Sequence, residues 1–296
     1  MKKNRFDRWF AAVSTFLLAL LLLAAAYPLY FVVIASLSNP SLVSTGQVFL
    51  YPREITLTGY QKVLEYRALW AGYANTVFYT VAYTAIATVV TLMAGFALAK
   101  RNLVGQKVIM AFMTLTMLFS GGLIPMYLLI RSLHMKDTVW PVILLGSVNV
   151  YNIIITRTFF RSSIPGELYE AASLDGCNQT RFFLYVALPI SPAIIAVLVI
   201  FSAVSQWNSW FNAMLYLNAP SMMPLQMVLR DIIISQQTFM SEMNFGMLGE
   251  DVANQAMLAE TMKYAVILVS ALPILCVYPF AQKYFVKGIM IGSIKG

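Results

Sequence analysis

Residues 9–37 read "WFAAVSTFLLALLLLAAAYPLYFVVIASL" and contain no Asp, Glu, Lys or Arg. About 20 predominantly apolar residues are enough for a helix to cross the hydrocarbon core of a bilayer. The residues before this run, "MKKNRFDR", are rich in Lys and Arg, as in a secretory signal. The apolar run is far longer than the roughly 7–15 apolar residues of a signal. The stretch therefore predicts a retained first transmembrane helix.

The whole chain has the composition of an integral membrane protein. Of its 296 residues, 60% are hydrophobic and 11% are charged, whereas soluble domains average about 25% charged residues. The segments that qualify as spans are 10–37, 71–99, 107–131, 138–160, 185–212 and 262–284. The longer polar segments are an outer loop at 38–70 with a short helix at 59–68, an inner loop at 161–184 and an outer segment at 213–261. We therefore predict an all-α integral membrane protein with six spans, in one transmembrane domain over residues 1–296.

The distribution of charge predicts the orientation, because cytoplasmic loops carry an excess of Lys and Arg. With the N-terminus inside, the inner segments hold 13 Lys and Arg against four Asp and Glu, and the outer segments hold seven against eight. Both termini are therefore predicted to face the cytoplasm. The net charge of +8 is explained by this topology and does not require a nucleic acid as a partner. The predicted spans are expected to be surrounded by membrane lipid.

Several classes of transport and catalytic machinery leave no trace in the sequence. There is no G-x-x-x-x-G-K-[ST] phosphate loop, so the chain does not bind ATP by that route. No Asp, Glu or Lys lies deep within a predicted span, where carriers driven by ion gradients place such residues. No reactive cluster or metal-ligand spacing is present, so we expect no enzyme, no metal and no cofactor bound by this chain. Any driving energy should come from another subunit, and a self-contained secondary carrier is the alternative from a different class.

The inner loop has the pattern of two short helices separated by a turn. Residues 164–189 read "IPGELYEAASLDGCNQTRFFLYVALP". Pro165 suits a first helical turn and Glu167 favours the positive end of a helix. Gly176 suits a helix C-terminus, and Asn178 or Thr180 can cap a second helix. The sequence predicts a helix, a sharp turn and a second helix near the membrane surface. An ordinary amphipathic loop helix with a glycine stop is the alternative.

The same loop resembles a known family. Glu170-Ala171-Ala172, Gly176, Val186 and Leu188-Pro189 match the EAA loop of permease subunits of binding-protein-dependent ABC importers, with Val in the usual place of Ile. The match covers 20 residues with complete spacing. The resemblance implies the type I ABC importer permease fold, and it implies that this loop forms a coupling helix that docks on an ATPase. The residues implied in that contact are Glu170, Ala171, Ala172, Leu174, Asp175 and Gly176.

The end of the chain narrows the resemblance. Residues 278–296, "YPFAQKYFVKGIMIGSIKG", look like the tail of the sugar-importing branch, and most of all like a subgroup that takes up oligosaccharides and polysaccharide fragments such as alginate. This implies a sister permease in a heterodimer, two cytoplasmic ATPase subunits that bind ATP and Mg, an extracytoplasmic solute-binding protein and the bacterial cytoplasmic (inner) membrane. Gly292, Lys295 and Gly296 would reach the ATPases. An ABC importer for a non-sugar solute is the alternative within the class.

Amide and aromatic side chains gather at the end of the fifth predicted span. Amides can bond to sugar hydroxyls, and indole faces can stack on sugar rings. An interfacial aromatic belt with polar ends is the alternative interpretation. Two asparagines in the fourth span are weaker candidates of the same kind. The candidate substrate-pathway residues are Gln206, Trp207, Asn208, Trp210, Asn212, Asn149 and Asn152.

Overall fold

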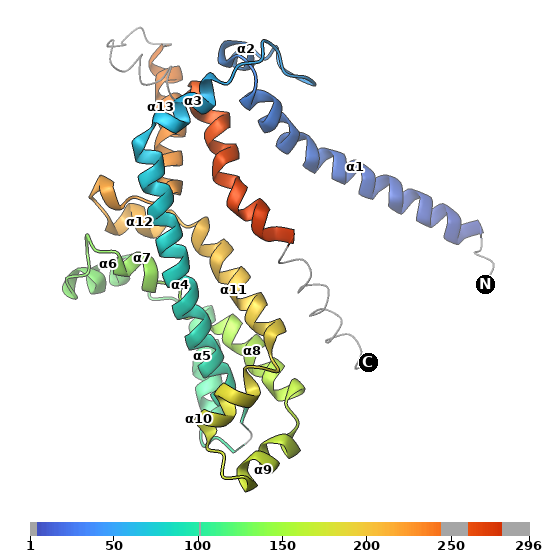
Figure 1. The fold of residues 1–296 in the computed structure, drawn as a ribbon, viewed down its shortest axis with the longest axis vertical. Coiled ribbons are helices and arrows are strands. Elements are labelled where there is room, and N and C mark those ends of the chain that lie inside the picture. Colours follow the sequence, from blue (N-terminus) through green and yellow to red (C-terminus); the bar gives the residue numbers. More distant parts are fainter. Residues whose placement is uncertain (1–4, 101, 244–259, 280–296) are drawn as a thin grey trace. The chain divides into compact units, whose positions relative to one another are not determined.

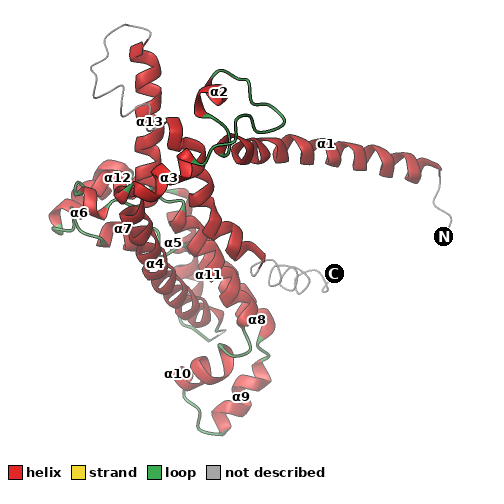
Figure 2. Ribbon diagram, turned by 45° about the horizontal axis from the view of Figure 1, so that its top comes forward, coloured by secondary structure: helices red, strands yellow, loops and turns green. Residues whose placement is uncertain are grey.

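The computed structural model describes residues 5–100, 102–243 and 260–279 of the chain. Within these ranges the chain consists of helices and loops, without a strand (Figure 2), which confirms the predicted all-α class. The chain divides into two compact units. The first comprises Met1–Leu69 and Leu229–Leu272, and the second comprises Trp70–Val228 and Pro273–Gly296. Figure 1 follows the chain through its helices.

Three of the described helices are each long and apolar enough to cross a membrane. They are the 28 residues Trp9–Ser36 within α1 (Arg5–Ser36), the 33 residues of α4 (Arg67–Ala99) and a last helix of 20 residues, Glu260–Pro279. Two pairs of shorter helices pass the same test only when each bent pair counts as one span. The described residues therefore offer three to five spans, whereas the sequence predicts six.

The first unit packs around the C-terminal end of α1. Most of α1 before that end is exposed and apolar on every side, as expected for a helix surrounded by lipid or by another membrane chain. The following loop contains α2 (Pro40–Ser44) and α3 (Thr58–Glu65), and α3 confirms the short helix expected at 59–68. The buried residues of this small core are Ile34, Ala35, Val43 and Val48.

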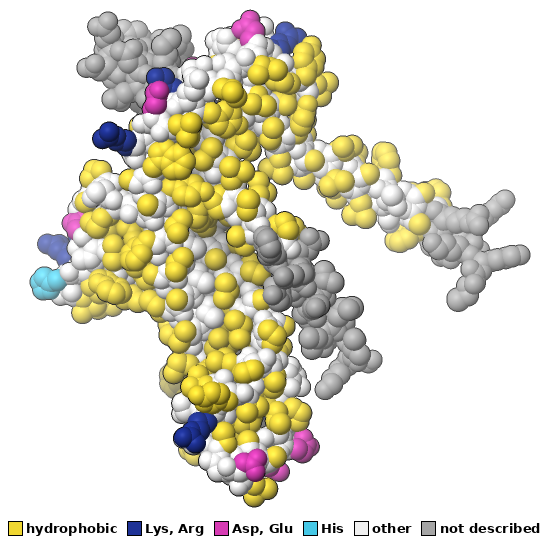
Figure 3. Space-filling view, viewed as in Figure 1, with side chains coloured by type: hydrophobic (Ala, Val, Ile, Leu, Met, Phe, Trp, Pro, Cys, Tyr) yellow, Lys and Arg dark blue, Asp and Glu magenta, His cyan; other side chains and the backbone are white. Residues whose placement is uncertain are grey.

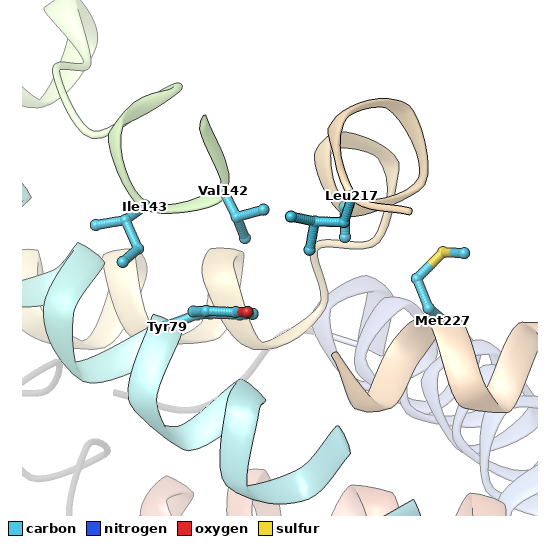
Figure 4. Packing of buried hydrophobic residues seen from close by; sticks show 6 residues of the cluster. Tyr79, Val142, Ile143, Leu217 and Met227 are labelled. Carbon is cyan, nitrogen blue, oxygen red and sulfur yellow. The ribbon is translucent and has the colours of Figure 1, made fainter. Parts of the chain in front are cut away.

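The second unit is built around α4. Side chains from α4, α7 (Trp140–Leu144), α12 (Phe211–Tyr216) and the start of α13 (Leu225–Met243) meet in one apolar cluster (Figure 4). The buried members of this cluster are Tyr79, Val142, Ile143, Ala213, Leu217 and Met227. On the face shown in Figure 3, the charged side chains of this unit gather around α6 and around α9 and α10.

The third predicted span, 107–131, consists of two helices and is not one continuous rod. α5 (Gln106–Leu118) and α6 (Leu123–Ser132) meet at an angle of 109°. Gly122 between them has φ 85° and ψ 174°. This backbone conformation is essentially restricted to glycine, so the glycine permits the sharp change of direction.

The fourth predicted span, 138–160, is also interrupted, which corrects the expectation of a single helix. α7 ends at Leu144 and α8 (Val150–Ser163) begins six residues later. Gly146 in the break has a positive φ of 84°, and its carbonyl accepts a hydrogen bond of 2.7 Å from the Tyr83 hydroxyl of α4. The Tyr83 hydroxyl thus satisfies a backbone carbonyl that lies outside the regular hydrogen bonding of a helix.

The fifth predicted span begins later than residue 185. α10 (Gln179–Phe182) continues into a π-helical turn, η1 (Phe183–Ala187), and this pair meets α11 (Pro192–Trp207) at 87°. Pro192, not Pro189, starts the long helix; its ring removes an N–H that a first turn leaves unpaired in any case. A short break separates α11 from α12, and a 3-10 turn, η2 (Pro220–Met222), precedes α13.

Candidate functional site

The inner loop forms the helix, turn and second helix that the sequence predicts. α9 spans Gly166–Leu174, with Pro165 at its N-cap and Glu167 in its first turn, where a negative charge favours the helix dipole. Gly176 follows with a φ of 72°. Its N–H donates to the Ser173 carbonyl at 3.1 Å, and the Cys177 N–H donates to the Ala172 carbonyl at 2.9 Å. These two bonds make a Schellman ending of the helix, which explains the glycine.

The second short helix is capped by Asn178 rather than by Thr180. The Asn178 side-chain oxygen accepts a hydrogen bond of 2.8 Å from the Arg181 backbone N–H at the start of α10. Such a cap satisfies one of the N–H groups that the first turn of a helix leaves unpaired. Two short helices joined by a defined turn therefore form a compact projection (Figure 1).

The six candidate coupling residues lie together on this projection. Leu174 at the end of α9 is 90% exposed. Glu170, Ala171, Asp175 and Gly176 are also exposed. Ala172 is the exception, because it is half-buried and packs against the interior of the unit. The projection thus exposes charged, small and apolar side chains side by side, on a surface that a partner could cover.

The opposite face of α9 is fixed to the rest of the second unit. Tyr169, Ala172 and Cys177 pack against a buried cluster shared by α4, α8, α10, η1 and α11. The buried members of that cluster are Leu92, Phe160, Phe182, Ala187, Ile194 and Leu198. The projection is therefore anchored by an apolar core and is not an isolated surface loop.

A set of polar contacts at the C-terminal end of α4 is not predicted from the sequence. The Leu98 carbonyl accepts a hydrogen bond of 3.0 Å from Arg157 Nε on α8 and a second bond from Gln106 Nε2 at the start of α5. Lys100 Nζ donates to Gln179 Oε1 on α10. Burial lowers the pKa of Lys100 below its ordinary value. In the sequence these residues belong to inner loops or to the inner ends of predicted spans, and nothing in their spacing marks them as neighbours.

The candidate pathway residues of α11 and α12 have structural contacts of their own. Gln206 is buried, and its Nε2 donates to the Val142 carbonyl of α7 at 3.2 Å. Trp207 is also buried, with its ring edge-on to Tyr73 at 5.6 Å. Asn208 Nδ2 donates to the Val204 carbonyl at 2.8 Å, one turn back in its own helix. These contacts explain how the three side chains are held, and their role toward a substrate stays a prediction.

The remaining pathway candidates differ in exposure. Trp210 is 40% exposed and lies edge-on to Phe211 at 5.8 Å, and Asn212 is half-buried. Asn149 caps α8 by accepting a hydrogen bond of 3.1 Å from the Asn152 backbone N–H. The structure therefore assigns Asn149 a local role in starting a helix, while the half-buried Asn152 side chain has no role assigned.

The N-terminal half of α4 carries two polar residues, Asn75 and Thr76, whose side chains form hydrogen bonds to another part of the chain. The Asn75 side-chain amide donates to the Ser221 and Met223 carbonyls at 2.8 and 3.0 Å. The Thr76 hydroxyl accepts a hydrogen bond of 2.8 Å from the N–H of Leu225, the first residue of α13. These two side chains fasten the non-helical stretch before α13 and the start of that helix to α4, and they satisfy backbone groups of both. A mean hydropathy over the span cannot reveal such contacts, because the polar residues are few.

An open groove of about 580 Å³ runs beside α5. Its wall is apolar along the helix, with positive charge from Lys107 and Arg157. The lining residues are Gln106, Lys107, Met110, Ala111, Thr114, Leu115, Leu118 and Arg157. None of the pathway residues predicted from the sequence lines it. Across the described ranges, no group of three or more His, Cys, Asp or Glu side chains is placed to hold a metal ion.

Two of the sequence predictions fall outside the described residues. The tail residues Gly292, Lys295 and Gly296 belong to 280–296, and the part 244–259 of the outer segment 213–261 is likewise not described. Their assignments rest on the sequence alone.

Known proteins resemble this chain over nearly its whole length. No family model matches it. It is 37% identical to the protein LplC of Bacillus subtilis over 91% of this chain and 89% of that one. It is 36% identical to the polygalacturonan/rhamnogalacturonan transport system permease protein YtcP of the same organism, over the full length of both. The melibiose/raffinose/stachyose import permease protein MelC is 24% identical over 96% of each chain.

A solved structure agrees with these relatives. One chain of a bacterial ABC transporter involved in the import of the acidic polysaccharide alginate superposes with a TM-score of 0.86 at 32% identity, over 96% of this chain and 99% of that chain. Likeness of sequence and of fold thus extends from end to end. The chain belongs to the family of permease subunits of sugar ABC importers, which are transport components and not enzymes.

Proposed function

We propose that the protein is the permease subunit through which an ABC importer moves oligosaccharides that carry carboxylate groups. The end-to-end likeness to a polygalacturonan/rhamnogalacturonan permease and to an alginate importer supports this substrate class. Lys107 and Arg157 give the groove beside α5 a positive charge that suits an anionic sugar. The relative that imports melibiose, raffinose and stachyose is less similar to this chain, at 24% identity.

The proposed coupling element is α9. Glu170, Ala171, Ala172, Leu174, Asp175 and Gly176 would dock in a cleft of a separate ATPase subunit. The observation that carries the assignment is that an anchored helix ends in an exposed leucine within the loop that bears the family motif. The small side chains of the two alanines permit close approach, and Glu170 supplies one charge for a basic partner residue. ATP closure of the ATPases would then displace α9 as a rigid lever.

The proposed assembly follows from the family. The chain would pair with a sister permease, two cytoplasmic ATPase subunits that hold ATP and Mg, and an extracytoplasmic solute-binding protein, in the bacterial inner membrane. It would form one transmembrane domain with six spans and both termini inside. The charge distribution supports that orientation, and the broken helices explain why fewer than six spans are single straight rods. The tail residues Gly292, Lys295 and Gly296 would add a second contact with the ATPases.

The proposed pathway residues are Gln206, Trp207, Asn208, Trp210, Asn212, Asn149 and Asn152. In support, α11 and α12 place amide and aromatic side chains around one break in the helix. The break frees this segment to change shape when the transporter opens and closes. The buried Gln206 and Trp207 would act by holding the pathway wall, and the exposed Trp210 would meet the sugar.

Charge reversal on α9 tests the coupling assignment. The complex, purified through a tag on this chain, should lose its ATPase subunits when it carries Glu170→Lys together with Ala171→Arg. Glu65→Lys, at an exposed acid of α3, is the matched control and should retain them. If the double variant keeps both ATPase subunits and sugar-stimulated ATP hydrolysis, α9 is not the docking element.

Transport assays separate the proposed substrate and energy source from the alternatives. Proteoliposomes with the binding protein should take up galacturonate oligomers in preference to raffinose, and only with ATP. A binding protein that prefers peptides or polyamines would make the chain an importer of another solute. Uptake that persists without ATPase subunits and stops with an uncoupler would make it a secondary carrier.

A further inference from the structure

The contact between α9 and the membrane helices converges on one aromatic side chain, Phe96 of α4. Its ring lies 5.6 Å from Phe160 on α8, 6.2 Å from Phe182 on α10 and 5.0 Å from Phe183 in η1. Phe182 in turn meets Tyr169 on α9 edge-on at 5.1 Å. Five rings thus form a continuous chain from α9 through α10 and η1 to α4 and α8.

The rings are well placed to transmit force because they are closely packed. Phe160 and Phe182 are 2% and 1% exposed, so no solvent separates the helices at this level. Protein interiors pack at the density of organic crystals and yield little when pushed. Aromatic pairs at these separations also prefer specific angles, which resists sliding. A displacement of Tyr169 with α9 therefore has to displace Phe182 and Phe96 as well.

A polar contact closes the same junction on its aqueous side. Lys100, one turn beyond Phe96, donates through Nζ to Gln179 Oε1 at the start of α10. The ammonium group also lies 5.1 Å from the centre of the Phe96 ring, within the range of a cation–π contact. The two α10 residues Gln179 and Phe182 are thus tied to Phe96 of α4 and to Lys100, the residue that directly follows this helix.

The helix that receives this contact is itself joined to α8. Gly95, next to Phe96, lets α4 approach so closely that a β-carbon there would lie 2.6 Å from the Thr156 side chain. Arg157, the next residue of α8, donates to the Leu98 carbonyl of α4 at 3.0 Å. Movement passed to Phe96 therefore reaches both helices and the groove beside α5, which Arg157 lines.

We infer that Phe96, with the Lys100–Gln179 hydrogen bond, is the transmission contact that passes the displacement of α9 to α4 and α8. These are positioning residues, because they act through the helices that they join. The inference rests on the proposed coupling role of α9. It adds the internal route, which the surface residues of α9 do not specify, and it predicts that binding of the ATPases and sugar movement can be separated by mutation.

The first test measures sugar moved per ATP hydrolysed, in proteoliposomes of the full complex with galacturonate oligomers as the probe. Phe96→Leu keeps an apolar side chain but removes the ring contacts. We expect ATPase subunits to remain bound and hydrolysis to continue, while sugar moved per ATP falls at least about threefold. Phe78→Leu, at a 55% exposed ring of the same helix, is the control and should leave the ratio unchanged.

A double-mutant cycle tests the polar contact. Lys100→Met and Gln179→Met should each lower the ratio, and the double variant should be no worse than Lys100→Met alone, because the glutamine substitution removes only the bond that is already lost with the lysine. Gln179→Glu should preserve the ratio, since a carboxylate also accepts from Lys100. The inference is overturned if these variants lose ATP hydrolysis and sugar uptake equally and also melt at a lower temperature. Such a result would show that the contact only stabilises the fold.

The outcome for α9 is kept separate by running the Glu170→Lys, Ala171→Arg variant in parallel. If that variant releases the ATPases and Phe96→Leu keeps the normal ratio, the coupling role of α9 stands and the transmission contact is wrong. If the α9 variant keeps its ATPases, the proposed coupling role fails and the inference fails with it.

Discussion

At the scale of single residues, Gly95 decides how α4 and α8 meet. Any side chain there would overlap Thr156, which is fully buried and donates through its hydroxyl to the Asn152 carbonyl at 2.7 Å. Close approach through small residues is a common way for membrane helices to pack, because lipid gives no hydrophobic drive for their association. In the sequence, Gly95 was only a glycine that a span tolerates.

Replacing Gly95 by alanine should destabilise the protein. The new methyl group would lie 2.6 Å from Thr156 Cγ2, so the two helices must separate. We expect a cost of about 1–3 kcal/mol, as for other overpacked cores. The melting midpoint in detergent should fall. Gly166→Ala, where no atom lies within 4 Å of the new β-carbon, is the matched control; an equal fall there would contradict the packing argument.

Leu174 should matter to a partner and not to the fold of this chain. At 90% exposure it has almost no contacts to lose, so Leu174→Ser should change the stability of the isolated subunit by less than about 0.5 kcal/mol. Co-purification of the ATPase subunits should nevertheless drop, because the leucine would fill a pocket in the docked complex. Val104→Ser, at a 93% exposed valine of another inner loop, should leave co-purification intact. Identical behaviour of the two variants would count against a contact at Leu174.

At the scale of elements, the broken helices matter more than the straight ones. The 109° bend between α5 and α6 and the 87° bend before α11 turn long apolar segments into paired half-helices. Proline or glycine accounts for each: Gly122 takes up a backbone conformation that other residues avoid, and Pro192 starts a new helix. Non-helical backbone at membrane depth is tolerated only where protein or water covers it. We therefore expect these bends to face other subunits or the pathway.

Adjacent glycines in the α5–α6 break should respond differently to alanine. Gly122→Ala forces a β-carbon into a conformation at φ 85° and ψ 174°, at a cost of about 1–3 kcal/mol. Gly121 has no left-handed φ and open space around it, so Gly121→Ala should be tolerated. Thermal stability and sugar uptake of the two variants measure the difference. Comparable losses would show that the bend does not depend on the backbone of Gly122.

At the scale of the whole molecule, the predicted orientation rests on charge. The excess of Lys and Arg in the inner segments predicts that α9 lies in the cytoplasm and the loop of α2 and α3 outside. An ATPase contact on α9 requires this orientation. Nothing in the helix packing alone distinguishes the two sides of a membrane.

Cysteine accessibility in intact cells tests that orientation. After Cys177 and Cys276 are replaced by serine, Glu54→Cys should react with an impermeant maleimide added outside. Glu167→Cys on α9 should react only after the cells are permeabilised. Both side chains are exposed, so a difference in labelling reports the side of the membrane and not burial. Labelling of Glu167→Cys from outside would invert the topology.

The sequence by itself determined the membrane class, the helical class and the helix–turn–helix pattern of the inner loop. These follow from local properties: long apolar runs and the backbone preferences of Gly176 and Asn178. The tertiary structure decided where the spans break and which residues meet. Phe96, Lys100 and Gln179 are neighbours only because α4, α10 and η1 come together, and a contact between residues 79 apart in sequence leaves no local signal.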